Sequence, residues 1–371
     1  MSIISSIKDR FGGSKDITGQ HIQLKVCMMG PRAVGKTSIL TSIFHESDRK
    51  LIESKLYFKA VGSTGEVLQK GYDQLSGIFE HITDETATPP PGVNASKEIT
   101  TFDFQLGLKG SGANPKQKHS NVDVNITDFP GEFVDENHPE HQKVVDYING
   151  SQVIMVAIDT VHLMEEEGKY NEARNRSSYL CKKIALLLDQ LPETERKLIL
   201  LVPLKCEKYA IEQRWDELDK KVKDAYAELI DKVKDEKFSH RIGLFITPIQ
   251  TLGGVKFDKF GRDENGNVLI DPEDKCPKEV LYKYHRAVPG REPMYMPAFC
   301  IQPLYYLIAF ALNQYKFNKD QGGVFSTMLK GLFGLFSSDL DFYQACRDLV
   351  ANVKTNGHGF QIINNPNFIK P

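Results

Sequence analysis

The chain has 371 residues, of which 40% are hydrophobic and 26% charged, an ordinary composition for a water-soluble globular protein. Its formal net charge of −2 argues against nonspecific nucleic-acid binding. The six cysteines are scattered and form no C-x-x-C pair, which predicts reduced thiols and a cytoplasmic protein, not a disulfide framework or a zinc site.

The sequence predicts neither a secretory signal nor a membrane-spanning segment. The N-terminal segment, residues 1–20, has no long apolar core and no cleavage signature of a secretory signal. The apolar run at residues 303–312 is too short to span a bilayer.

The first strong motif follows an apolar stretch, residues 22–29, which predicts a buried strand. Residues 30–37 fit the phosphate-binding pattern G-x-x-x-x-G-K-[ST], and apolar residues at helical spacing follow. A glycine-rich curl and a helix N-terminus present several N–H groups to an anion. Lys36 would reach the β- and γ-phosphates, and the Thr37 hydroxyl would bind Mg²⁺. The predicted phosphate-binding residues are Gly30, Arg32, Ala33, Val34, Gly35, Lys36, Thr37 and Ser38.

A second motif closes a later strand. Residues 98–110 alternate as an amphipathic strand, and residues 121–128 alternate again and end at Asp128. Asp128 begins the sequence D-x-x-G, which ends at Gly131. A phosphate loop needs an acid at the end of a neighbouring strand to hold Mg²⁺, and Asp128 is the candidate.

Strands and helices then alternate along the chain. Buried strands are predicted at residues 151–160, 197–205 and 241–250, the last being the final strand of the sheet, and a helix at 177–191. Asn265-Gly266 predicts the turn of a hairpin. This order indicates an α/β fold with a mostly parallel sheet covered on both faces.

An apolar strand that ends in D-x-x-G after a phosphate loop resembles the TRAFAC-class, Ras-like P-loop GTPases. The resemblance implies a three-layer GTPase domain over residues 21–317, with insertions near 50–97 and 251–296 and a helical C-terminal extension at 318–371. It implies that the Gly131 N–H contacts the γ-phosphate, and that Glu132 stands where Ras carries the glutamine that orients the attacking water.

The resemblance also implies a Mg²⁺-binding hydroxyl in the first switch. Ser96 and Thr100 compete for this role, and Ser96 is slightly favoured because Thr100 is expected inside a strand.

Base recognition is expected after the strand at 197–205. Leu204-Lys205-Cys206-Glu207 resembles a variant of the family's [NT]-K-x-D pattern. The Lys205 stem could lie over the purine, and Glu207 could accept hydrogen bonds from guanine. Leu204 replaces a polar residue, so guanine versus adenine stays open. The insertions and P-x-K-C-E-K also resemble double-GTPase-type proteins of bacterial conflict systems.

The resulting expectation is a GTP/GDP-binding protein with slow Mg²⁺-dependent hydrolysis, in which Lys36 and Glu132 serve catalysis and a protein partner reads the switch. The alternatives are an ATP-using P-loop enzyme and a nucleotide-binding scaffold without hydrolysis. An amphipathic helix is predicted at residues 324–336 and is expected to pack on the domain, with contact to a membrane surface as the less favoured interpretation.

Overall fold

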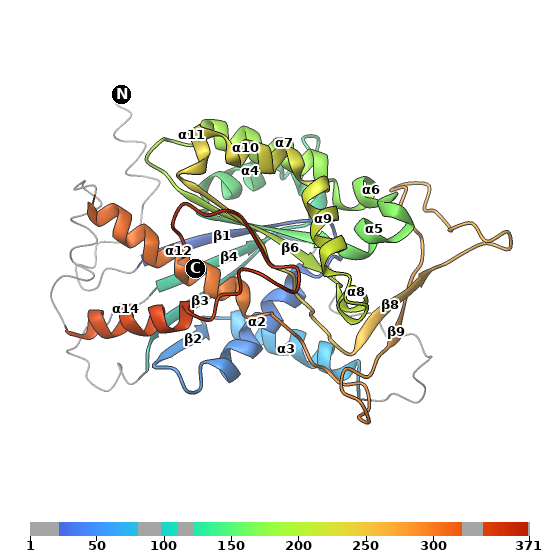
Figure 1. Cartoon of the computed structure of the whole chain (residues 1–371), viewed down its shortest axis with the longest axis horizontal. Helices are drawn as coiled ribbons and strands as arrows, with labels where there is room; N and C mark the ends of the chain where they lie inside the picture. The colour runs from blue at the N-terminus through green and yellow to red at the C-terminus, as the bar shows by residue number, and fades with distance from the viewer. Residues whose placement is uncertain (1–21, 81–97, 110–121, 321–336, 370–371) are drawn as a thin grey trace.

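The structure is a computed structural model that describes residues 22–80, 98–109, 122–320 and 337–369 (Figure 1). Its centre is an eight-stranded sheet with the strand order β10-β7-β6-β5-β1-β4-β3-β2. The strands are β1 (Ile22–Met29), β2 (Leu56–Ala60), β3 (Thr100–Leu108), β4 (Val122–Asp128), β5 (Val153–Asp159), β6 (Lys197–Leu204), β7 (Ile242–Ile246) and β10 (Gln361–Asn364).

The middle of the sheet is parallel and its edges are antiparallel. Parallel pairs join β4 to β1, β1 to β5, β5 to β6 and β6 to β7. Antiparallel pairs add β3, β2 and β10 at the two edges. The mixed α/β class with a mostly parallel sheet is therefore confirmed.

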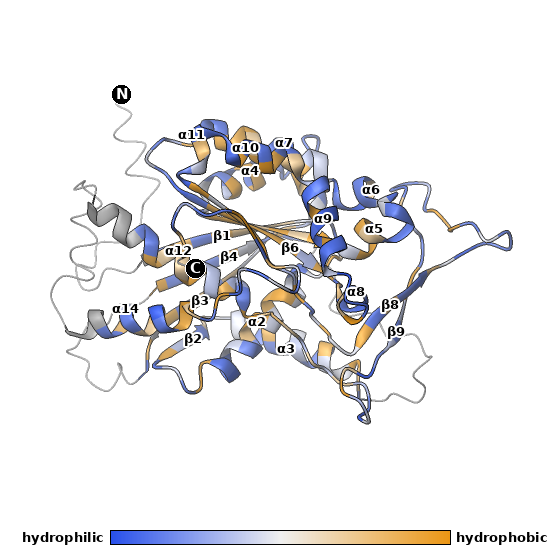
Figure 2. Ribbon diagram, in the orientation of Figure 1, coloured by the Kyte–Doolittle hydropathy of each residue, from blue (hydrophilic) through white to orange (hydrophobic). Residues whose placement is uncertain are grey.

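Helices cover both faces because successive side chains of each strand point to opposite sides. In β1, Leu24, Val26 and Met28 join one apolar cluster, whereas Cys27 and Met29 join the other. The first face is covered by α2 (Lys36–Lys50), α3 (Thr64–Gly77), α12 (Gln302–Asp320) and α14 (Ser337–Val350). The second is covered by α4 (His141–Gly150), α7 (Ser177–Gln190), α9 (Trp215–Ala225), α10 (Ala227–Lys234) and α11 (Glu236–Ser239). Figure 2 shows hydrophobic central strands between helices that turn hydrophilic residues outward.

Short elements complete the chain between these layers. They are η2 (Gly131–Val134), α5 (Thr160–Met164), η3 (Glu165–Gly168), α6 (Asn171–Asn175), α8 (Glu207–Ile211), β8 (Val255–Phe260) and β9 (Val280–Tyr284). β8 and β9 pair antiparallel in a separate two-stranded sheet. The predicted turn lies between them: Gly266 has φ +83° and its N–H donates to Asp263 O at 3.0 Å.

The expectation that residues 241–250 form the last strand is wrong. β10 follows it and pairs antiparallel with β7, so the C-terminal extension contributes a strand to the sheet as well as helix α14. The physical reason is that β7 would otherwise present an unpaired edge. Residues 361–364 are too few to show a readable apolar period.

The expected insertion after residue 50 also joins the sheet in part. β2 pairs with β3 as an edge strand, and α3 packs against α2. The predicted helix at 324–336 lies outside the described residues. Within the described ranges, no helix has both the length and the apolar character needed to cross a membrane. The six cysteines are free and buried.

Candidate functional site

The phosphate-loop motif forms a tight curl between β1 and α2. Gly30 and Gly35 have φ of +143° and +113°, values that residues with a side chain rarely adopt. A side chain at Gly30 would also come within 2.6 Å of the Ala157 carbonyl oxygen on β5. Ala33 adopts φ +56° without being glycine, and such local strain is typical of functional loops.

Lys36 is the first residue of α2 and its amine lies inside this curl. The Nζ donates to the carbonyl oxygens of Gly30 at 3.3 Å and Pro31 at 3.2 Å, and lies 3.8 Å from Asp128 Oδ1. Burial lowers the pKa of Lys36, while the Asp128 carboxylate opposes that effect. A cation is therefore fixed at the start of the helix, where the helix dipole also favours an anion.

Thr37 and Asp128 form a pair of oxygen donors beside this lysine. The Thr37 Oγ1 donates to Asp128 Oδ2 at 3.0 Å. Asp128 ends β4 and stands opposite Met28 of β1, so the parallel pairing of these strands brings it to the loop. A hydroxyl and a carboxylate are ligands that Mg²⁺ accepts, and the donor set fits that ion.

The D-x-x-G segment lies directly against the phosphate loop. A side chain at Gly131 would come within 2.5 Å of Gly30 O and 3.0 Å of Arg32 N. The next residue, Glu132, is exposed, and its carboxylate lies close enough to Lys36 to oppose the pKa lowering caused by burial. The structure therefore brings the first two motifs together.

Lys205 is also brought to the phosphate loop. It has φ +58°, and its Nζ donates to Asp159 Oδ2 at 2.8 Å and to Ala33 O at 3.4 Å. Leu204, which replaces the polar residue of the family pattern, lies against Gly35: a side chain there would be 3.8 Å from the Leu204 Cδ1.

Glu207 is only 4% exposed at the start of α8. Its Oε1 accepts from the N–H groups of Leu252 at 3.3 Å and Gly253 at 3.4 Å, in the loop after β7. Burial raises the pKa of Glu207, and the two N–H groups partly oppose this. The carboxylate is therefore bonded to the backbone of the loop that follows β7.

The remaining predicted residues differ in what their side chains can do. Arg32 and Ala33 are exposed, whereas Val34 and Ser38 are buried, so Val34 can offer only its backbone to a phosphate. Thr100 is the first residue of β3 and pairs with Asp128. Ser96, its competitor, lies outside the described residues.

Asp159 was missed by the sequence reasoning. It ends β5 and is fully buried. Its carboxylate pairs with the side chains of Lys205, His162 and Arg174. The available signal was a lone acid at the end of a continuous apolar strand.

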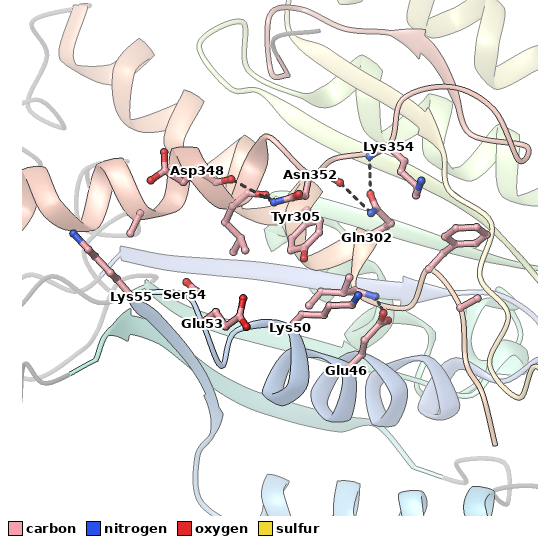
Figure 3. A pocket seen from close by; sticks show the side chains of 15 residues that line it. Glu46, Lys50, Glu53, Ser54, Lys55, Gln302, Tyr305, Asp348, Asn352 and Lys354 are labelled. Atoms are coloured by element: carbon pink, nitrogen blue, oxygen red, sulfur yellow. Dashed lines mark hydrogen bonds between the residues drawn. The ribbon is translucent and has the colours of Figure 1, made fainter. Parts of the chain in front are cut away.

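A cavity of about 840 Å³ opens elsewhere, at the other end of α2 (Figure 3). Its charged lining has both signs, with Glu46, Glu53 and Asp348 set against Lys50, Lys55 and Lys354. Lys36 and Lys50 are separated by 14 helical steps, or about 21 Å. The cavity therefore lies too far from Lys36 to be part of the site at the phosphate loop.

No family model matches the chain, and no curated protein matches it in sequence. Solved structures that match it include the GTPase-like domain of S. cerevisiae Ski7 bound to GTP, with 14% identity and a TM-score of 0.31 over 68% of this chain and 45% of that one. The same domain bound to GDP and inorganic phosphate matches with 14% identity and a TM-score of 0.30, over 72% and 48%. The chain therefore spans less than half the length of either structure.

Proposed function

We propose that the chain binds GTP and GDP with Mg²⁺ in a Ras-like, TRAFAC-class domain over residues 21–317, hydrolyses GTP slowly, and acts as a switch read by a protein partner. One observation carries the proposal. Lys36, Thr37 and Asp128 converge at the start of α2, with Gly131 pressed against the same loop.

The proposed roles follow from these positions. Backbone N–H groups of residues 30–38 and the Lys36 amine would bind the phosphates. Thr37 and Asp128 would hold Mg²⁺, with Ser96 or Thr100 as a further ligand, and the ion would neutralise phosphate charge.

Gly131 would respond to the γ-phosphate. This glycine packs against the backbone of the phosphate loop, so its N–H would lie near a terminal phosphate bound there. Loss of that phosphate would release the segment, which is the common basis of GTPase switching. Glu132 would orient the attacking water from the next position along the chain.

Lys205 and Glu207 would recognise the base, which leaves one serious alternative. Glu207 is buried and already accepts two backbone N–H groups, and Leu204 is apolar. These observations favour, as a second candidate, a nucleotide-binding enzyme or scaffold without guanine selectivity. A carboxylate has about four acceptor positions, however, so Glu207 retains capacity for guanine.

Glu207→Ala separates the two candidates. Calorimetry with GTP and ATP should show GTP binding weakened by about 1.5–3 kcal/mol, roughly tenfold to a hundredfold, with any ATP binding spared. Glu212→Ala, an exposed acid just after α8, is the matched control and should change neither. An unchanged GTP affinity would remove Glu207 from the base site, and a parent that prefers ATP would favour the alternative.

A further inference from the structure

The fully buried carboxylate of Asp159 gathers basic side chains next to the phosphate loop. Its Oδ2 is 2.8 Å from Lys205 Nζ and 3.4 Å from Arg174 Nε, and its Oδ1 is 2.9 Å from His162 Nδ1. Burial alone would raise the pKa of Asp159, but Lys205, His162 and Arg174 together hold it well below its ordinary value. The carboxylate is therefore charged at neutral pH.

The backbone next to Arg174 is held to β5 by the side chain of Asn175. The neighbouring Asn175 accepts from Asp159 N–H at 2.8 Å and donates to Asp159 O at 3.1 Å, so its side chain fixes α6 to the end of β5. Both contacts are buried. The position of the Arg174 backbone is thus set by the same strand that touches Gly30 through Ala157.

The Arg174 side chain is bonded to Asp159 through one of its three nitrogens. Its Nε donates to Asp159 Oδ2 at 3.4 Å, and within the described part of the chain Nη1 and Nη2 make no hydrogen bond. The side chain is 20% exposed, so the guanidinium is partly open. Lys205, bonded to the same carboxylate oxygen, reaches Ala33 of the loop.

We propose that Arg174, anchored through Nε on Asp159, binds a phosphate oxygen of the nucleotide with its terminal nitrogens. The inference rests on the proposed function and adds a residue to it. A planar guanidinium forms charge-assisted, two-point hydrogen bonds to phosphate, and the Asp159 anchor removes much of the side-chain entropy that such a contact costs. Arg174 comes from the segment between β5 and α7, outside the three motifs.

The test compares Arg174→Ala with Arg176→Ala, a neighbouring arginine that faces Asp135 and the ring of Tyr179. Calorimetry with Mg²⁺ should show Arg174→Ala binding GTP roughly tenfold to a hundredfold more weakly than the parent. Arg176→Ala should bind within about twofold of the parent. Arg174→Lys should recover only part of the loss, because an ammonium cannot keep the anchor and the two-point contact together. Melting temperatures without nucleotide should be alike for the parent and the Lys variant.

The outcomes separate this inference from the function on which it rests. Unchanged GTP affinity in Arg174→Ala, with a parent that binds, overturns the role of Arg174 alone. Equal losses in the Arg174 and Arg176 variants, or full recovery by lysine, overturn it as well. A parent that binds neither GTP nor GDP overturns the proposed function and this inference with it.

Discussion

Glu207 is a buried acid whose ionisation works against the fold. Its pKa is raised, so the folded protein holds the proton more tightly than the unfolded chain does. Stability should therefore fall as pH rises from the ordinary value of 4.5 through the raised pKa. A buried acid that lowers the stability of the fold when it ionises is consistent with a role in binding.

Glu207→Gln should remove this pH dependence, because glutamine can still accept from Leu252 and Gly253 but cannot ionise. We expect the melting temperature of the variant without nucleotide to exceed that of the parent more at about pH 7.5 than at about pH 5. Glu212→Gln, at an exposed position, should show no such trend. If the melting temperature of Glu207→Gln exceeded that of the parent by the same amount at both pH values, the ionisation of Glu207 would not be the cause of the pH dependence.

With glutamate at position 132 in place of glutamine, we expect GTP hydrolysis to be slow, on the order of 10⁻⁴ to 10⁻² s⁻¹ without a partner. The Glu132 carboxylate faces Lys36 and would also face the γ-phosphate. If it only orients water, Glu132→Gln should hold or raise single-turnover hydrolysis, because the amide orients water without repelling phosphate. If it is a base, turnover should fall. A parent rate above about 1 s⁻¹ would contradict the switch.

The sequence predicted the site residues that belong to short motifs. It missed those that lie far apart in the sequence and meet only in the folded chain. Lys36 and Thr37 follow from one loop, and Asp128 from the end of one strand. Arg174 has no motif around it, and it meets Asp159 where the Asn175 side chain bonds α6 to the end of β5. The partner of Glu207 is a backbone loop, which no side-chain pattern reveals.

At the scale of elements, the contact between η2 and the phosphate loop is the feature that would carry switching. At Gly131→Ala the added carbon would meet Gly30 O at 2.5 Å, a backbone atom that cannot rotate away. The variant should therefore lose most of its preference for GTP over GDP and keep GDP affinity within a fewfold of the parent.

The matched control is Gly150→Ala at the end of α4, where nothing lies within 4 Å of the added carbon. Competition binding with GTP and GDP measures how strongly each variant prefers GTP over GDP. A Gly131→Ala variant that still separates the two nucleotides as the parent does would show that this contact does not sense the γ-phosphate.

The elements that sequence predicted best are those with a clear internal period. β1, β4, β5 and β6 are apolar or alternating over seven or eight residues, and each was located. β2 and β10 have five and four residues, and their place is decided by the open edges of β3 and β7. Edge pairing is a tertiary effect, so a local pattern cannot specify it.

At the scale of the whole molecule, Arg196 ties the C-terminal segment to the sheet. Its Nη2 donates to Pro366 O at 2.8 Å and its Nη1 to Asn313 Oδ1 at 3.3 Å, while the guanidinium lies 4.5 Å from the Phe368 ring centroid. Arg196→Ala should lower the free energy of unfolding by about 2–3 kcal/mol, as expected for lost charged hydrogen bonds in a buried site.

Trp215 provides the readout, since it is the single tryptophan and its ring centroid lies 6.0 Å from that of His358 in the same C-terminal segment. Denaturant unfolding followed by its emission should show the destabilisation. Arg347→Ala, exposed on α14, should unfold like the parent. An Arg196→Ala variant as stable as that control would remove Arg196 from this role.

The most direct test of the central claim is calorimetric titration of Mg²⁺-GTP into the parent and into Lys36→Ala. The Lys36 amine lies inside the phosphate loop and not in the apolar core, so its removal should abolish binding while the melting temperature without nucleotide stays near that of the parent. Lys50→Ala, at the other end of the same helix, should bind as the parent does. Saturable binding by the parent that is lost only in Lys36→Ala is the predicted result, whereas equal GTP affinity in the parent and Lys36→Ala would contradict the phosphate-loop assignment.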